Sequence, residues 1–373
     1  MIKMLFFIPE LSGGGAERVL CNLVNNMDKE KFDITVQTIS DADAEKYLAP
    51  EIQYKSINKC KSKIGKKIFH LWVRLFAELK ILYPLYIKDN YDIEVAYLEC
   101  GATKIMATST NEKALKLAWV HCDLTKKDGF MQSIRRFKEF YQKYDKVVCV
   151  SETVRQSYKR LFGDTPESVV LYNVNDEKEI IERSQEFSIV SNNKLKIVSV
   201  GRLSNEKGFD RLIEACHLLK NRAYEFEVLI LGEGTERENL ESLIEKYQLE
   251  ENIKMIGFVD NPYPYLFSAD IIVCSSRFEG FSTVITEAVI LGKSIVTTPC
   301  AGMDEILGES EYGIITEDTV EGIYKGIKEF LDSEEKREYY SSMAKRRGKE
   351  FSKEILVKRI EDFFVEELKE KVG

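Results

Sequence analysis

The stretch Arg277-Phe-Glu-Gly-Phe-Ser-Thr-Val-Ile-Thr-Glu-Ala288 is the most informative part of this chain. It contains two carboxylates, Glu279 and Glu287, which stand eight residues apart. The residues before it form a strand-like run, and the residues after it form an apolar helix pattern that ends at Gly292. We therefore expect Glu279 at the turn between strand and helix, and Glu287 about two turns into the helix, at roughly 1.5 Å rise per residue.

A turn that opens a helix exposes backbone N–H groups, and such a helix start is a natural site for an anion. One carboxylate among these amides suits sugar hydroxyls and the second suits a ribose, which together match the needs of a nucleotide-sugar. An ordinary structural role stays open at this point. Two Glu residues at this spacing occur by chance in a charged protein, and the helix dipole favours Glu near a helix start in any case.

Short strand-like runs alternate with helix-like patterns along the chain, which predicts an α/β protein with parallel sheets. A length of 373 residues favours two domains rather than one. The polar segment 176–194 is the expected link between two Rossmann-like domains. Strands are expected at 2–8, 33–39, 93–97, 116–121 and 146–150 before this link, and at 195–200, 226–231, 253–256, 271–274, 294–298 and 313–316 after it.

The composition is that of an ordinary globular protein, with 44% hydrophobic residues, 31% charged residues and a net charge of −8. No run of about 18 apolar residues is present, so no membrane span is expected, and the N-terminus resembles a strand rather than a signal peptide. The eight scattered cysteines are expected to be reduced, as in a cytoplasmic protein. A pI near 5.4 and the absence of a recognisable binding motif argue against nucleic-acid binding.

A glycine-rich turn, Ser12-Gly-Gly-Gly-Ala-Glu-Arg-Val-Leu20, follows the first expected strand and opens a helix. Glycines permit close backbone approach to a ligand, so a phosphate or a sugar can bind such a turn. A dinucleotide fingerprint would need Gly-x-Gly-x-x-Gly, but Glu17 stands two residues after Gly15. A plain tight turn is the other interpretation. Nearby, Asp41 and Asp43 are interpreted as part of a solvated turn rather than as metal ligands.

A cationic turn, Val200-Gly-Arg-Leu-Ser-Asn-Glu-Lys-Gly-Phe-Asp210, follows the first strand of the second half. Arg202 offers a forked set of donors and Lys207 a compact charge, so together they can neutralise a diphosphate leaving group as its charge grows. Solvated surface charge is the alternative interpretation. Because the helix dipole disfavours cations at a helix start, we expect an anionic ligand at this loop.

Three motifs together resemble the retaining glycosyltransferases of family 4: Gly-Gly-Ala-Glu-Arg at 14–18, Gly-Arg-Leu-x-x-Glu-Lys-Gly at 201–208 and Glu-Gly-Phe-x5-Glu at 279–287. The resemblance covers nearly the whole chain and is strongest to bacterial enzymes of capsule, O-antigen or lipid-linked oligosaccharide assembly. It implies the GT-B fold, in which two facing Rossmann-like domains hold the donor in the cleft between them. The implied domains are 1–175, joined by a C-terminal helix at about 352–373 that returns to it, and 190–351.

The family pattern also implies roles for individual residues. Arg202 and Lys207 would bind the donor diphosphate, Glu279 the transferred sugar, and Glu287 the ribose hydroxyls. His121, at the end of a strand, matches the family's active-site His near the donor sugar, although the residues alone leave a structural role open. The other implied donor contacts are Gly14, Gly15, Gly201, Val259 in the loop that faces the base, Gly280, Phe281, Ser282 and Thr283.

The implied reaction moves a hexose or N-acetylhexosamine from a nucleotide-sugar, most commonly UDP-linked, with retention of configuration and without a metal or a cofactor. The implied acceptor is a sugar hydroxyl of a glycan carried on undecaprenyl diphosphate, at the inner face of the bacterial cytoplasmic membrane. The chain departs from the family at Leu171-Tyr-Asn-Val174, where Pro-Asn-Gly is usual, and this affects the linker rather than the chemistry. The sugar, the linkage and the oligomeric state are not specified by the sequence.

The segment Lys59–Arg74 combines a lysine cluster with Ile, Phe, Leu and Trp, and residues 55–88 hold nine basic residues but one acid, Glu78. Basic residues beside an apolar aromatic helix face suit an anionic membrane surface. In the alternative interpretation, Trp72, Leu75 and Phe76 pack in the core and the lysines are solvated. A second basic and aromatic patch lies at 126–138.

Two other functions are compatible with parts of this sequence. A nucleotide-sugar epimerase on the same fold would need acid and base groups at the sugar C2, and none can be identified. A non-catalytic subunit that binds a sugar nucleotide is the alternative from a different class, and the complete set of motif residues argues against it.

Overall fold

The computed structural model describes residues 1–11, 14–40, 44–58, 63–126, 130–189 and 194–373, with the backbone alone for 44–45, 63–68 and 70. Ser12, Gly13, Asp41, Asp43 and Lys127, which the sequence interpretation included, lie outside the described residues, as do 59–62 of the basic segment. The chain divides into two compact units. The first comprises Met1–Val174 and Lys353–Gly373, and the second comprises Asn175–Ser352.

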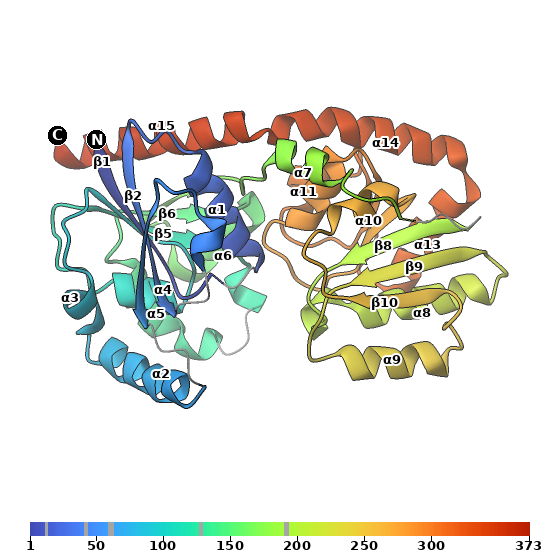
Figure 1. Ribbon diagram of the computed structural model, residues 1–373, viewed down its shortest axis with the longest axis horizontal. Helices are drawn as coiled ribbons and strands as arrows, with labels where there is room; N and C mark the ends of the chain where they lie inside the picture. The colour runs from blue at the N-terminus through green and yellow to red at the C-terminus, as the bar shows by residue number, and fades with distance from the viewer. Residues whose placement is uncertain (12–13, 41–43, 59–62, 127–129, 190–193) are drawn as a thin grey trace. The chain divides into compact units, whose positions relative to one another are not determined.

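The first unit is built on a parallel sheet of seven strands in the order β3-β2-β1-β4-β5-β6-β7 (Figure 1). Five of these strands were expected, whereas β3 and β7 were not. Both missed strands lie at the edges of the sheet, where a strand pairs on one side only and needs no continuous apolar run. The strands are β1 (Ile2–Ile8), β2 (Phe32–Ser40), β3 (Gln53–Asn58), β4 (Ile93–Ala96), β5 (Leu115–Val120), β6 (Lys146–Cys149) and β7 (Glu167–Val170).

Helices cover this sheet, and the C-terminal helix returns to the first unit as expected. Phe364 of this helix is fully buried and packs edge-on against Phe6 and Phe32 of the sheet. Its ring also lies 6.3 Å from that of Trp119, so one aromatic cluster joins the two ends of the chain within this unit. The helices are α1 (Gly15–Asn26), α2 (Lys63–Glu78), α3 (Leu82–Tyr86), α4 (Gly101–Met106), α5 (Ile134–Tyr141), α6 (Glu152–Phe162) and α15 (Lys353–Val372).

The second unit contains a parallel sheet of six strands in the order β10-β9-β8-β11-β12-β13. All six were expected from the sequence. The four central strands, β9, β8, β11 and β12, are short buried runs rich in Val, Ile and Leu, whereas the edge strands β10 and β13 are less buried. The strands are β8 (Leu195–Val200), β9 (Phe226–Leu231), β10 (Ile253–Gly257), β11 (Ile271–Cys274), β12 (Ser294–Thr297) and β13 (Ile314–Ile315). The helices are α7 (Glu177–Arg183), α8 (Phe209–Lys220), α9 (Arg237–Lys246), α10 (Tyr263–Ser268), α11 (Thr283–Ile290), α12 (Met303–Leu307), α13 (Val320–Asp332) and α14 (Glu334–Gly348).

The strand order creates one point of reversal in each sheet. The chain extends each sheet from β1 or β8 toward one edge, and then returns to add β4 or β11 on the other side of that strand. In open parallel sheets, ligands bind outside the carboxyl ends of the strands at such a point. The loops that follow β1 and β4, and those that follow β8 and β11, are therefore the places to look for a site.

Candidate functional site

The loop after β8 (residues 201–208, the cationic loop) lies against the loop after β11 (residues 275–282). We call the second one the acidic loop because it carries Glu279. In the first of these loops, Gly208 adopts a left-handed conformation with φ of +62° and opens α8. A Cβ atom at Gly208 would stand 2.2 Å from the carbonyl oxygen of Ser275 in the other loop. Only glycine therefore allows the two loops to approach this closely. At the start of the cationic loop, Gly201 donates its N–H to the carbonyl of Leu231 at 2.9 Å.

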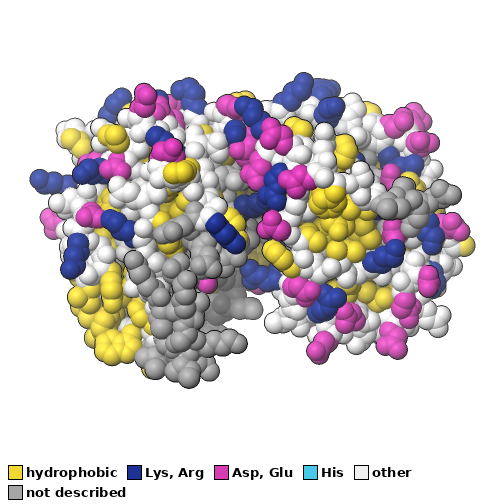
Figure 2. Space-filling view, viewed as in Figure 1, with side chains coloured by type: hydrophobic (Ala, Val, Ile, Leu, Met, Phe, Trp, Pro, Cys, Tyr) yellow, Lys and Arg dark blue, Asp and Glu magenta, His cyan; other side chains and the backbone are white. Residues whose placement is uncertain are grey.

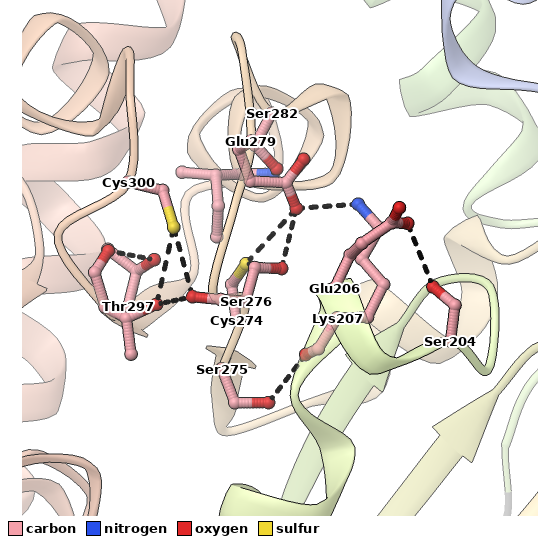
Figure 3. Close-up of polar contacts among 12 residues, drawn as sticks. Ser204, Glu206, Lys207, Cys274, Ser275, Ser276, Glu279, Ser282, Thr297 and Cys300 are labelled. Carbon is pink, nitrogen blue, oxygen red and sulfur yellow. Dashed lines mark hydrogen bonds and ion pairs between the residues drawn. The ribbon is translucent and has the colours of Figure 1, made fainter. Parts of the chain in front are cut away.

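Lys207 and Glu279 form an ion pair between these two loops (Figure 3). The Lys207 ammonium lies 2.6 Å from Glu279 Oε1, and the Ser276 hydroxyl donates to the same oxygen at 2.7 Å. Burial opposes the charged form of Lys207, but the Glu279 carboxylate outweighs it, so the pKa of Lys207 is raised above the usual value. The Lys207 side chain keeps 29% of its surface exposed, so its fixed positive charge is accessible to a ligand.

A second ion pair joins the same loops from the side. Arg277 donates to both carboxylate oxygens of Asp210, from Nη1 at 2.7 Å and from Nη2 at 2.5 Å. Its Nη1 also donates to the carbonyl of Asn205 at 2.9 Å, and its backbone N–H donates to the carbonyl of Glu206 at 2.8 Å. Burial raises the pKa of Asp210, but the bond from Arg277 outweighs it, so the carboxyl group has a lowered pKa and stays ionised. Arg277 thus holds the loop that carries Lys207.

Two further contacts complete the link between the loops. The Ser275 hydroxyl donates to the carbonyl of Lys207 at 3.1 Å, and Arg211 donates to the carbonyl of Ser275 at 2.7 Å. Arg211 is also paired with Asp318 at 2.5 Å. The sequence interpretation assigned no role to these residues or to Arg277, Asp210 and Ser276. The available signal was their position, since all except Asp318 stand within four residues of Lys207 or Glu279 in the sequence.

The helix that follows the acidic loop carries the second carboxylate. The Ser282 hydroxyl caps α11 by accepting the N–H of Ile285 at 3.4 Å, which leaves the N–H groups of Thr283 and Val284 outside the bonds of the helix. The preceding residues, Gly280 and Phe281, are buried. Glu287 stands in the second turn as expected and is 4% exposed. The Tyr263 hydroxyl donates to Glu287 Oε1 at 3.4 Å.

Two other expected donor contacts lie at the carboxyl edge of the same sheet. Arg202 follows β8 and is exposed, and within the described part of the chain its side chain has no hydrogen bond or ion pair. Val259 is half-buried in the loop after β10, next to Phe258, whose ring is 74% exposed. Arg202 is therefore a cation that can bind an anion. Val259 lies next to the exposed Phe258 ring, which can stack on a base.

The first unit contains the remaining expected residues. Gly14 and Gly15 follow β1, and Gly14 is the N-cap of α1, with its N–H donated to the Glu17 carboxylate at 3.0 Å. His121 directly follows β5, and its backbone N–H donates to the buried carboxylate of Glu99 at 3.2 Å. Glu99 follows β4, which lies between β1 and β5 in the sheet. The loops after β1, β4 and β5 therefore lie together at the carboxyl edge of the sheet. Glu99 had not been identified from the sequence.

The second half of the chain matches a known protein family. Residues 181–347 match the family described as "Glycosyl transferases group 1". This range contains both loops of the site, from Arg202 to Glu287, as well as the helix that follows them.

Two curated relatives cover almost the entire chain. The first is from Campylobacter jejuni and is named N-acetylgalactosamine-N,N'-diacetylbacillosaminyl-diphospho-undecaprenol 4-alpha-N-acetylgalactosaminyltransferase. It is 29% identical over 366 residues, which cover 95% of this chain and 96% of the relative. The second is the amylovoran biosynthesis glycosyltransferase AmsD of Erwinia amylovora, 22% identical over 97% of this chain and 99% of the relative.

Solved structures share the fold at low sequence identity. Anabaena HepE, solved in complex with UDP and glucose, matches with a TM-score of 0.77 and 18% identity over 98% of this chain and 100% of its own. Sucrose-phosphate synthase from Thermosynechococcus elongatus matches with a TM-score of 0.80 and 13% identity over 98% and 99% of the two chains. The expected fold, with two Rossmann-like domains of the GT-B type, is confirmed by these matches.

Proposed function

We propose the reaction that this chain catalyses, starting from the match of its residues 181–347 to the glycosyl transferases group 1. It moves a hexose or N-acetylhexosamine from a nucleotide-sugar, UDP-linked, to a sugar hydroxyl of a glycan carried on undecaprenyl diphosphate. The anomeric configuration is retained, and neither a metal nor a cofactor takes part. The name of the Campylobacter jejuni relative supports the lipid-linked acceptor, and that of the Erwinia amylovora relative supports a role in the assembly of a surface polysaccharide.

The observation that carries this proposal is the ion pair between Lys207 and Glu279 at the point of reversal between β8 and β11. The pair keeps a cation partly exposed beside a carboxylate that can accept hydroxyl groups. Arg202 adds a second, exposed cation from the same loop. A diphosphate joined to a sugar is complementary to two cations next to a carboxylate.

In the proposed reaction, the bond between the anomeric carbon and the departing phosphate oxygen breaks. The bond to the acceptor oxygen forms on the same face of the sugar, and the acceptor proton passes to the departing phosphate oxygen. Arg202 and Lys207 stabilise the negative charge that grows on that phosphate. Glu279, and His121 as the family pattern implies, orient the sugar and stabilise the positive charge at the anomeric carbon.

The other residues bind the donor without taking part in bond changes. We assign the ribose hydroxyls to Glu287 and the base to the loop that contains Val259. The phosphates and the sugar are assigned to the backbone around Phe281 and to the glycine turns, with the contacts at Gly14, Gly15, Gly201, Gly280, Ser282 and Thr283. The enzyme would act as a peripheral protein at the inner face of the cytoplasmic membrane.

The direct test uses purified protein with radiolabelled UDP-sugars and a lipid-linked oligosaccharide acceptor. We expect transfer with one sugar and slow hydrolysis of the same donor without acceptor. Lys207→Ala should lower turnover by at least tenfold, which corresponds to about 1.4 kcal/mol of barrier. The matched control is Lys325→Ala, which removes an exposed lysine from α13 of the same unit and should leave turnover unchanged.

The products separate the competing functions. Recovery of an epimeric UDP-sugar would indicate an epimerase, and donor binding without hydrolysis or transfer would indicate a binding subunit. A loss below tenfold in Lys207→Ala would contradict the role of Lys207 at the diphosphate. Product with inverted configuration at the anomeric carbon would contradict the same-face reaction.

A further inference from the structure

We propose that the exposed apolar stripe of α2, formed by Leu71, Trp72 and Leu75 and continued by Leu79, inserts into the surface of an anionic membrane. The four side chains are 72%, 53%, 53% and 57% exposed, respectively. Figure 2 shows hydrophobic side chains gathered over α2 and α3 at the lower left of the view. This inference rests on the proposed lipid-linked acceptor, because such an acceptor is presented at a membrane surface.

The stripe is not the face by which α2 packs on its own unit. Val73 and Ala77 are buried, with 8% and 9% exposed, and they follow one another at helical spacing on the inner face. Trp72 instead contacts Phe76 in an edge-on arrangement at 5.2 Å and keeps half of its surface outside. The interpretation in which Trp72 and Leu75 belong to the core is therefore wrong, and their exposure needs another explanation.

The surroundings of the stripe are positively charged. Glu78, the one acid among residues 55–88, is paired with both Lys104 and Arg136, so its negative charge is compensated. Arg74 and Lys80 are exposed beside the stripe. Apart from Arg136, which is already paired with Glu78, the neighbouring helix α5 adds two exposed cations, Arg135 and Lys138, and one exposed acid, Glu139.

This charge distribution favours an anionic membrane surface, rather than a second copy of the chain, as the partner of the stripe. Apolar side chains within a basic border are complementary to a bilayer with anionic headgroups, since the side chains enter the acyl boundary while the cations meet the phosphates. A second copy of the chain would place the same basic border opposite itself, which like-charge repulsion disfavours. None of the described helices combines the length and the apolar character that a bilayer-spanning helix needs.

The chain contains its own reporter for this contact. It has two tryptophans, and Trp119 is 1% exposed whereas Trp72 is 53% exposed. We expect phosphatidylglycerol vesicles, but not phosphatidylcholine vesicles, to shift the tryptophan emission to the blue. Brominated acyl chains should quench that emission. The Trp72→Phe variant should bind the same vesicles without the shift, because its remaining tryptophan is buried.

The variant that tests the surface is Leu71→Asn/Leu75→Asn, which keeps Trp72 as the reporter. We expect its vesicle affinity to fall by at least tenfold in co-sedimentation. The matched control is Tyr339→Asn/Ile355→Asn, which changes two side chains that are 55% and 56% exposed on other helices and should bind vesicles normally. Thermal unfolding of both variants checks that each remains folded.

Three results would overturn the proposal. They are the absence of a blue shift with anionic vesicles, equal vesicle binding by Leu71→Asn/Leu75→Asn, and a blue shift that depends on protein concentration without vesicles, which would indicate a second copy. Slow hydrolysis of the donor in solution is the separate readout of the proposed function. If hydrolysis persists without vesicle binding, the surface inference alone fails, and if vesicles bind without any turnover of donor, the proposed reaction alone fails.

Discussion

Arg277 and Asp210 are joined by two parallel hydrogen bonds of 2.7 and 2.5 Å, and this pair connects the two loops that carry Glu279 and Lys207. Neither residue belongs to the diphosphate-binding set that the motifs suggested. Their geometry nevertheless determines where Lys207 lies, because Arg277 also donates to the carbonyls of Asn205 and Glu206, the two residues that precede Lys207. We regard Arg277 as a positioning residue.

Replacement of Arg277 by Lys keeps the charge but removes the forked donor set. We expect kcat to fall about tenfold with a smaller change in the KM for the donor, since Lys207 is displaced rather than lost. Stability should fall by only about 0.5–1 kcal/mol, because both partners of the pair are about one-third exposed and partly screened by solvent. Steady-state kinetics and thermal unfolding measure the two effects.

A double-mutant cycle is the control for this prediction. Asp210→Asn should reproduce the kinetic defect of Arg277→Lys, and the double variant should be little worse than either. Additive losses would show that the two residues act separately and would refute the positioning role.

The raised pKa of Lys207 predicts a defined pH dependence of stability. A group whose pKa is higher in the folded state stabilises the protein fully below its unfolded value of 10.5 and loses that contribution as the pH rises through the folded value. The difference in free energy of unfolding between the wild type and Lys207→Met should stay constant from about pH 7 to about pH 9 and shrink above about pH 10.5. Urea titrations at each pH measure this difference.

Lys325→Met, which removes an exposed cation from α13, corrects this measurement for the general loss of positive charge. The difference in free energy of unfolding between the wild type and Lys207→Met should not decrease at pH values below about 9. A decrease that begins between neutral pH and about pH 9 would be inconsistent with a protonated Lys207 held by Glu279.

Glu287 is expected to recognise the ribose of the donor. Glu287→Gln keeps the shape of the side chain but removes the charged acceptor, so the affinity for UDP should fall about tenfold, or roughly 1.4 kcal/mol. The affinity for a UDP analogue that lacks both ribose hydroxyls should be the same in wild type and variant. Calorimetric titration compares the two nucleotides, with Glu321→Gln, an exposed residue of α13, as the matched control. An equal loss for both nucleotides would rule out a contact with the ribose.

Gly208 is expected to tolerate no side chain. In Gly208→Ala the new Cβ meets the Ser275 carbonyl at 2.2 Å, so the two loops must separate and the bond between Lys207 and Glu279 must break. We expect donor affinity to fall more than tenfold and stability to fall by about 2 kcal/mol or more, of which the left-handed backbone accounts for about 1. Donor titration and thermal unfolding test both expectations.

Gly292→Ala provides the matched control for Gly208→Ala. Gly292 has nearly the same φ of +61°, but the nearest atom to an added Cβ is the Cβ of Lys345 at 3.0 Å, a much milder approach than the 2.2 Å at Gly208. This variant should lose only about 1 kcal/mol and bind the donor normally. Normal donor binding by Gly208→Ala would show that the close approach of the loops is not required.

The sequence was most informative where residues interact with their near neighbours in the chain. Buried parallel strands need continuous runs of Val, Ile and Leu, so the four central strands of the second unit could be predicted. Its edge strands β10 and β13 were also predicted, because each keeps Ile residues in a short run. The turn at Glu279 and the helical position of Glu287 followed from the same local patterns. The edge strands β3 (Gln53–Asn58) and β7 (Glu167–Val170) escaped prediction because each is short and at least half polar, and is defined by its partner in the sheet rather than by its own periodicity.

Local patterns in the sequence alone thus determined the α/β architecture, the loops after each strand and the identity of Lys207 and Glu279. Only the tertiary structure decided that these two residues meet, 72 positions apart, because the order of the sheet makes β8 and β11 neighbours. It also decided that Arg277 binds Asp210 and that Trp72 points outward from α2. Partners and exposure depend on which segments become adjacent in space, and periodicity within one segment does not contain that information.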